Sequence, residues 1–282
     1  MKFGVNTFVW VSPLKTGDLP GLAQKARAAG AEILELAIED PRLIDIPAVK
    51  AGLAEAGLQP IVCGAFGPER DLASQNPAYR ENARQYIRWL VDAAAELGSP
   101  TVIGPMYSAV GKAHLDDPRA REAEWDLSAA GVREMAAYAA PKGVSLALEA
   151  LNRFETDMIN TVSQGLAFID DVGMENVGLH LDSFHMHLEE KSSGAAIRAA
   201  GKKIFHFHAC ENDRGIPGTG QVRWDEIASA LHAVGYDGPV VIESFTPAVK
   251  EISRAVCIWR EIAPSQDAIA SEGLKFLRSI LA

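Results

Sequence analysis

The sequence predicts an α/β fold, a closed (β/α)₈ barrel, on three observations. The chain has 282 residues, a length that suits one such barrel or about two average domains. Short apolar runs alternate with longer helical patterns from one end to the other, and no Pro/Gly/Ser linker or charge block divides them. Eight such units of about 35 residues each match the repeat of the barrel. We therefore expect residues 1–282 to form a single domain.

The apolar runs are too short for helices, and their nearly continuous apolar character is typical of parallel strands buried on both faces. In chain order they cover residues 3–8, 32–37, 60–65, 101–106, 144–149, 177–182, 204–208 and 239–243. An open doubly wound sheet fits less well, because no G-x-G-x-x-G or Walker A pattern follows the first run.

Helical patterns fill the intervals between the runs. The clearest covers residues 78–97, with apolar residues three and four positions apart and Gly98 directly after it. A glycine at that place commonly ends a helix in a left-handed conformation. A last helix is expected from about Asp267 to Leu281, where its apolar face can pack on the barrel or on a partner.

Composition and charge exclude several classes of protein. Hydrophobic residues make up 48% and charged residues 23%, as in soluble globular chains, and no apolar run is long enough to cross a bilayer. Lys plus Arg number 27 against 37 Asp plus Glu, a net charge of −10 that argues against nucleic acid as a partner. The three cysteines form no paired framework and the start lacks signal-peptide features, so we expect a cytoplasmic protein with no membrane partner.

Potential metal ligands end four consecutive predicted strands. They are Glu149, Asp182, His208 and Glu243. Because they are separated by about one βα unit each, we expect them to meet at the C-terminal mouth of the barrel, where such enzymes carry their sites. Three crowded carboxylates repel one another unless a cation or protonation relieves them. Oxygen ligands with one imidazole favour Mn²⁺, Mg²⁺ or Co²⁺. The alternative is that each carboxylate caps the next helix or pairs with a nearby cation.

The residues next to these ligands have other expected roles. Period-two alternation places His180 and His206 in the barrel interior one layer below, as supporting donors rather than ligands. Cys210 follows His208 by two residues and lies in a predicted loop, so we do not expect it to bind the metal.

Several motifs in the second half of the chain resemble those of the ketose 3-epimerases. This family comprises the D-tagatose, D-psicose (allulose) and L-ribulose 3-epimerases of the xylose-isomerase-like barrel superfamily. The motifs are EALNRFE at 149–155, LDSFHMHLEE at 181–190, HFHACENDRGIPGTG at 206–220, Trp224-Asp225 and VVIESF at 240–245. Their order and spacing match through most of residues 140–262, and the combination is specific where a single short motif would not be.

The resemblance implies a metal-dependent isomerase that inverts C3 of a free ketose and forms a homodimer or homotetramer. Its metal, usually Mn²⁺ with Co²⁺ and Mg²⁺ as alternatives, would be held by Glu149, Asp182, His208 and Glu243. Glu149 and Glu243 would also act as the catalytic acid/base pair. The residues implied to hold the C1 to C3 end of the sugar are Glu155, His185 and Arg214.

The implied chemistry explains why two carboxylates are needed. Epimerisation removes a proton beside the C2 carbonyl and returns one to the opposite face of C3, which requires groups on two sides of the carbon. Glu149 and Glu243 end the fifth and eighth predicted strands, across the metal from each other. A cation bound to O2 and O3 would polarise the carbonyl and stabilise the cis-enediolate.

The sequence departs from the family pattern in two segments. D-psicose 3-epimerases often have Tyr at the position of Asn6, and the loop 106–111 carries Tyr107 but no Trp. We expect both segments to face the distal end of the sugar, so ribulose, psicose, tagatose, fructose and sorbose all stay open as substrates. Neither segment supplies a cationic cluster, which argues against a phosphorylated sugar.

Five other functions are open to a chain of this type. Aldose–ketose isomerases, hydroxypyruvate isomerase and inosose dehydratase share the barrel and the metal, and differ in whether the carbonyl moves or water is lost. A phosphodiesterase resembling the apurinic endonucleases is disfavoured by the seven histidines and the net charge of −10. A non-catalytic sugar-binding protein would not require acid/base groups on two faces.

Overall fold

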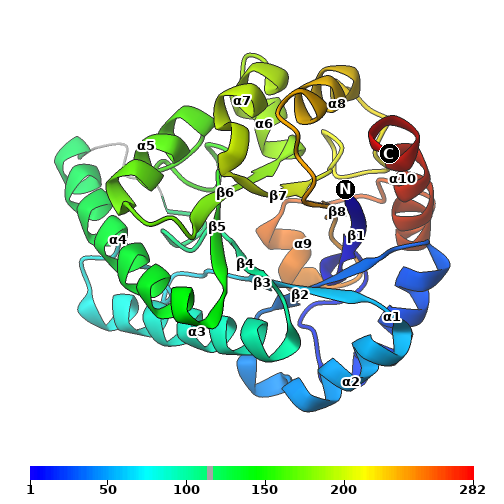
Figure 1. Cartoon of the computed structure of the whole chain (residues 1–282), viewed down its shortest axis with the longest axis horizontal. Helices are drawn as coiled ribbons and strands as arrows, with labels where there is room; N and C mark the ends of the chain where they lie inside the picture. The colour runs from blue at the N-terminus through cyan, green and yellow to red at the C-terminus, as the bar shows by residue number, and fades with distance from the viewer. Residues whose placement is uncertain (113–116) are drawn as a thin grey trace.

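The computed structural model describes residues 1–112 and 117–282, and it has the predicted barrel. Parallel strands close on themselves in sequence order, with β1 paired to β8, and helices surround them (Figure 1). The strands are β1 (Lys2–Asn6), β2 (Ile33–Ile38), β3 (Gln59–Gly64), β4 (Thr101–Gly104), β5 (Ser145–Glu149), β6 (Val177–Asp182), β7 (Ile204–His208) and β8 (Pro239–Ile242). Each predicted apolar run therefore coincides with a strand to within two residues at every boundary.

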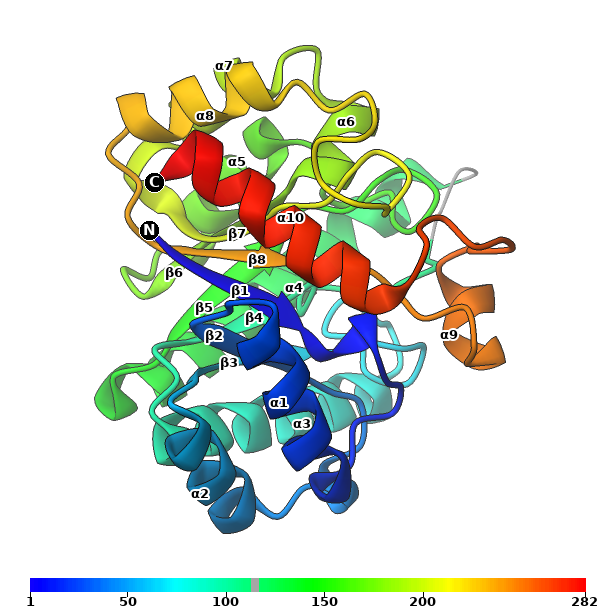
Figure 2. The same ribbon diagram turned by 90° about the vertical axis from the view of Figure 1, so that its right-hand side faces the viewer.

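The helices that follow the strands form the outer layer, apart from α9 (Lys250–Ala255), which lies at the C-terminal mouth of the barrel (Figures 1 and 2). They are α1 (Leu19–Ala28), α2 (Ile46–Ala56), α3 (Pro77–Leu97), α4 (Pro118–Ala139), α5 (Val162–Val172), α6 (Ser183–Glu189), α7 (Ser193–Ala200), α8 (Trp224–Ala233), α9 (Lys250–Ala255) and α10 (Gln266–Leu281). The predicted helix at 78–97 is α3, which Asn76 caps by accepting the Ala78 N–H and which Gly98 ends with a φ of 83°. In the described ranges, no helix has the length and apolar character needed to cross a bilayer.

The last helix packs on its own barrel. α10 runs between α1 and α8 (Figure 2), and its Ile269, Leu274 and Leu277 are fully buried. This settles the choice left open by the sequence: the apolar face of the helix is covered by the chain itself.

The barrel interior is divided into an apolar and a polar layer. Ile33, Ile61, Ile103, Ala147 and Val241 pack together toward the N-terminal ends of the strands. Two residues further along their strands, Ile33, Ala147 and Val241 are followed by glutamates, which face the same way because strand side chains alternate. The charged groups therefore lie on an apolar floor, on the side of the C-terminal mouth.

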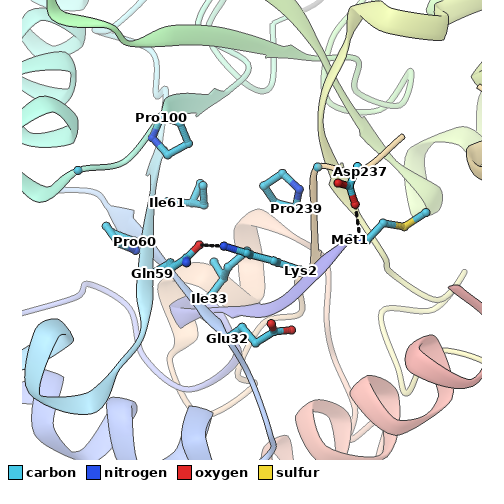
Figure 3. Close-up of a pocket in the computed structure, with 12 residues that line it drawn as sticks. Met1, Lys2, Glu32, Ile33, Gln59, Pro60, Ile61, Pro100, Asp237 and Pro239 are labelled. Carbon is cyan, nitrogen blue, oxygen red and sulfur yellow. Dashed lines mark hydrogen bonds and ion pairs between the residues drawn. The ribbon is translucent and has the colours of Figure 1, made fainter. Parts of the chain in front are cut away.

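A hollow of about 790 Å³ opens at the N-terminal end of the barrel (Figure 3). Ile33 and Ile61 line it, Lys2 Nζ donates to Gln59 Oε1 at 3.0 Å, and the Met1 amine is paired with Asp237 at 2.6 Å. None of the predicted site residues lines this hollow, so the candidate site belongs to the other end.

Candidate active site

A cavity of about 350 Å³ at the C-terminal mouth contains most of the predicted site residues. Its charged and polar lining includes Glu149, Glu155, His185, Arg214 and Glu243. The other two predicted residues are almost completely buried and touch this lining: Asp182 contacts Arg214 and His208 contacts Glu243.

The four predicted metal ligands come from neighbouring strand ends. β5 ends at Glu149, β6 at Asp182 and β7 at His208, and Glu243 directly follows β8. Asp182, His208 and Glu243 offer ligand atoms that lie within 4.8 Å of one another, and Glu149 stands in the same relation to Asp182. The structure thus brings the four side chains into one cluster centred on Asp182.

Burial and like charge shape the electrostatics of this cluster. Burial, and secondly the charge of Glu243, raise the pKa of Glu149 well above its ordinary value. Burial also tends to raise the pKa of Asp182, but Arg214, His185 and His208 together outweigh burial and lower this pKa. The guanidinium Nη1 lies 2.6 Å from Asp182 Oδ2 and 3.1 Å from Glu243 Oε2. One guanidinium faces three carboxylates here, so negative charge is in excess.

His208 adds a nitrogen donor to this acidic cluster. Its Nδ1 lies 3.5 Å from Glu243 Oε2 and makes no hydrogen bond to any described residue. Burial by itself would lower the pKa of His208, but the carboxylates of Glu35 and Glu243 raise it well above its ordinary value. The donor set of three carboxylates and one imidazole fits a hard or borderline divalent cation.

The loop between β7 and α8 positions Arg214. Glu211 holds this loop together through hydrogen bonds. Its carboxylate accepts the backbone N–H groups of Asn212, Gly218 and Val222 and the indole N–H of Trp224. The loop holds Arg214 at a φ of 64°, a left-handed conformation that is strained for a side chain other than glycine and often found at functional sites.

His185 lies one helical turn after Asp182, on α6. Its Nδ1 accepts the Asn152 backbone N–H at 3.0 Å, and burial lowers the pKa of His185 to about 4. The ring is therefore neutral near pH 7 and carries its proton on Nε2, 3.6 Å from Glu149 Oε1. This N–H lies 3.3 Å from Arg214 Nη2, so the cavity wall presents two donors side by side.

Glu155 completes the predicted substrate contacts from the loop after β5. Its Oε1 accepts the Asn152 side-chain N–H at 2.8 Å, and burial raises the pKa of Glu155. Asn152 thus links Glu155 and His185, and the predicted residues Glu155, His185 and Arg214 share one wall of the cavity.

Sequence reasoning missed Glu35. This glutamate on β2 is 0% exposed, and its Oε1 lies 2.7 Å from His208 Nε2 and 2.5 Å from Asn6 Nδ2. The available signal was a charged residue in the middle of the apolar strand ILELAI, at a position that faces the barrel interior.

The first strand differs from its expected role. Asn6 does not reach the distal end of the cavity, because it is fully buried, donates to Glu35 and accepts the Phe8 N–H at 2.8 Å. In the loop after β4, Tyr107 is likewise buried and bonded to the Ile159 carbonyl. These two segments instead contribute apolar lining, which also comes from the loop after β3 and the chain after β8. The apolar lining residues are Phe8, Phe66, Pro105, Val110, Phe245 and Ile252.

The interior histidines and Cys210 lie where the alternation places them. His180 and His206 are fully buried in the barrel, with His180 Nδ1 3.7 Å from Glu149 Oε2 and His206 Nε2 2.8 Å from Glu35 Oε2. Cys210 is in a loop, and its Sγ lies within 4.8 Å of ligand atoms of Asp182, His208 and Glu243. Burial raises the pKa of this thiol well above its ordinary value, and Arg214 Nη1 donates to its Sγ at 3.0 Å.

Comparisons with known proteins place the chain in a family. The family described as xylose isomerase-like TIM barrel matches residues 23–280. The ketose 3-epimerase of Arthrobacter globiformis is 33% identical over 100% of this chain and 97% of its own length. The D-allulose 3-epimerase of Methylomonas sp., solved in complex with D-allulose, is 32% identical with a TM-score of 0.94, covering 99% of this chain and 97% of that chain. The D-psicose 3-epimerase of Clostridium cellulolyticum, solved with D-tagatose, is 32% identical with a TM-score of 0.91, covering 100% and 99%.

The chain belongs to the xylose isomerase-like TIM barrel family and, within it, to the ketose 3-epimerases, which are carbohydrate isomerases. This confirms the resemblance read from the motifs in the second half of the chain.

Proposed function

We propose that this protein inverts the configuration at C3 of a free ketose and uses a divalent metal held by Glu149, Asp182, His208 and Glu243. The observation that carries the proposal is a pair of buried carboxylates, Glu149 and Glu243, that line one cavity from β5 and β8. β6 and β7 lie between these two strands, so the carboxylates approach a bound sugar from different sides.

The two carboxylates exchange protons with C3 in turn. One carboxylate takes the C3 proton, and the electron pair of the broken C–H bond moves to form the C2–C3 double bond of the enediolate. The other, in its acid form, then gives a proton to the opposite face of C3, and the C2 carbonyl forms again. Burial raises the pKa of Glu149, which makes it a stronger base when ionised and a stable acid when protonated.

The metal is assigned to the four strand-end residues because their donor set fits one. Mn²⁺ is the expected ion, with Co²⁺ and Mg²⁺ as alternatives. When bound, such an ion supplies Lewis acidity at the carbonyl and offsets the charge that develops on the sugar oxygens.

The remaining polar residues suit the hydroxyl groups of a sugar. Arg214 and the Nε2–H of His185 are donors, and Glu155 is an acceptor, on the same wall of the cavity. Among the described residues that line the cavity, Arg214 is the one Lys or Arg side chain, and it already faces Asp182 and Glu243. A neutral ketose therefore fits better than a sugar phosphate, in keeping with the net charge of −10.

The test is product analysis after metal exchange. The protein is stripped with a chelator, reloaded with Mn²⁺, Co²⁺ or Mg²⁺, and incubated with ribulose, psicose, tagatose, fructose and sorbose. We expect a C3 epimer from at least one ketose, no product from the stripped protein and recovery with Mn²⁺. An aldose product would instead make the protein an aldose–ketose isomerase, and a dehydrated product would make it a lyase. Light scattering on the same sample checks the predicted homodimer or homotetramer.

A further inference from the structure

Glu35 reaches the proposed metal site from the opposite side of the barrel. It lies on β2 between the buried Leu34 and Leu36, and its side chain is completely enclosed. Its Oε1 stands 2.7 Å from the Nε2 of His208, the hydrogen-bond distance of a charge-assisted pair. The residue does not line the cavity, so it cannot touch a sugar there.

The carboxylate of Glu35 is held in place. The Asn6 amide donates to the same Oε1 at 2.5 Å, and Asn6 is itself fixed because its Oδ1 accepts the Phe8 N–H. The acceptor that faces His208 is therefore rigid.

Glu35 Oε1 occupies the Nε2 side of the His208 ring at 2.7 Å, where a carboxylate oxygen is an acceptor for a ring N–H. Nδ1 is then the ring nitrogen that faces Glu243, at 3.5 Å. That nitrogen makes no hydrogen bond to any residue in the described part of the chain. Carboxylates that hold the distal N–H of a metal-binding imidazole in this way fix its tautomer and its orientation.

We propose that Glu35 is a positioning residue of the metal site: it accepts the Nε2–H of His208 and thereby makes Nδ1 the ligand atom. The inference rests on the proposed function, because it assumes that His208 binds a metal. It adds a part of the site that comes from the β1–β4 half of the barrel.

A competing role for Glu35 is to neutralise the buried histidines without any effect on the metal. His206 provides the control for this role, since its Nε2 lies 2.8 Å from the other carboxylate oxygen, Oε2, without the alignment of a hydrogen bond. A change at His206 therefore disturbs the same buried layer and leaves the Oε1 contact to His208 in place.

The test measures Mn²⁺ affinity by electron paramagnetic resonance of the free ion, on the full chain. We expect Glu35→Leu, which has no acceptor, to weaken binding by about 10–100-fold, and Glu35→Gln, which keeps an acceptor oxygen, to weaken it less. His206→Gln is expected to bind within about twofold of the parent protein. Equal weakening in His206→Gln and Glu35→Leu would overturn the positioning role, as would parent-like affinity of a folded Glu35→Leu protein.

A second measurement needs no variant, in case Glu35→Leu does not fold. Imidazole ¹H–¹⁵N spectra of the parent protein loaded with diamagnetic Cd²⁺ or Mg²⁺ report which ring nitrogen of His208 keeps its proton. We expect the proton on Nε2 and the metal on Nδ1, and the reverse assignment would overturn the inference. If the parent protein binds no metal at all, the proposed function fails together with this inference, whereas metal binding through Nε2 contradicts the role of Glu35 alone.

Discussion

The two halves of the barrel mouth differ in chemistry. β5 to β8 lead into Glu149, Asp182, His208 and Glu243, whereas β1 to β4 end in Asn6, Ile38, Gly64 and Gly104. The β5–β8 half supplies the charged cluster suited to a metal, together with Phe245 and Ile252 from the chain after β8. The β1–β4 half supplies apolar cavity wall through Phe8, Phe66 and Val110. The comparison shows that the proposed catalytic groups are concentrated on one side of the closed sheet. The other side contributes apolar cavity wall and the contact of Glu35 with His208.

The largest expected effect comes from the two carboxylates of the charged half. Glu149→Gln and Glu243→Gln should each lower kcat by about 10³-fold or more, because an amide cannot exchange the proton, while some Mn²⁺ and sugar binding persists. Kinetics on the best ketose and calorimetric titration with Mn²⁺ measure the two effects separately.

Glu39→Gln is the matched control, because Glu39 is a lining carboxylate that follows β2 in the other half. It should leave kcat within about threefold of the parent value. If the three variants lost activity equally, the assignment of the catalytic carboxylates to the β5–β8 half of the mouth would be wrong.

Arg214 tests how much a cation next to the carboxylates of the β5–β8 half contributes to activity. Arg214→Gln removes the cation that contacts Asp182 and Glu243, so we expect kcat/KM to fall by about 100-fold. Arg214→Lys keeps the charge but not the fork of donors, and should lose less. Unchanged kcat/KM in Arg214→Gln would show that the guanidinium has no part in binding the ketose.

Gly104 tests how closely the backbones of β3 and β4 approach each other in the β1–β4 half. It has a φ of 125°, and a Cβ there would stand 2.7 Å from the backbone oxygen of Gly64. Gly104→Ala should lower the free energy of unfolding by about 1–3 kcal/mol. Gly21→Ala on α1, where nothing lies within 4 Å of an added Cβ, should instead be neutral or stabilising, by up to about 1 kcal/mol. Urea unfolding of both variants measures the difference, and equal stabilities would contradict the close approach.

The smallest expected effect is a pH dependence from Glu155. Burial raises its pKa in the folded protein, so its contribution to stability is present below the unfolded pKa and is lost as pH rises through the folded pKa. Metal-free Glu155→Gln should therefore melt slightly above the parent protein at pH 8, by about 1–2 °C, and the gap should close near pH 4. A gap that widens toward low pH would contradict the raised pKa.

The strands and the charged half of the mouth could be predicted from the sequence for a physical reason. Strands buried on both faces give continuous apolar runs, and a carboxylate at the end of such a run, as at Glu149 or Asp182, marks where a strand leaves the core. The spacing of one βα unit then places the ends side by side. The roles of Glu155, His185 and Arg214 came from the family resemblance, since their loops follow no simple period.

The contact of Glu35 with His208, which comes from the β1–β4 half, could not be predicted in the same way. Glu35 stands inside an apolar run, and its partners Asn6 and His208 are 29 and 173 residues away along the chain. Only closure of the barrel brings them together. The comparison with the family pattern placed Asn6 at the distal end of the sugar, but its side chain instead points to the buried carboxylate of Glu35 and donates to it.

The central claim is that two carboxylates of the charged half invert C3, and a single-turnover reaction in D₂O tests it most directly. Protein in excess is loaded with Mn²⁺ and equilibrated in D₂O before the preferred ketose is added, and NMR follows deuterium at each carbon. Because the proton that returns comes from a different carboxylate than the one that took the first, the account predicts deuterium at C3 of the epimer. An epimer that keeps its original hydrogen at C3, or label at C1 with an aldose product, would contradict it.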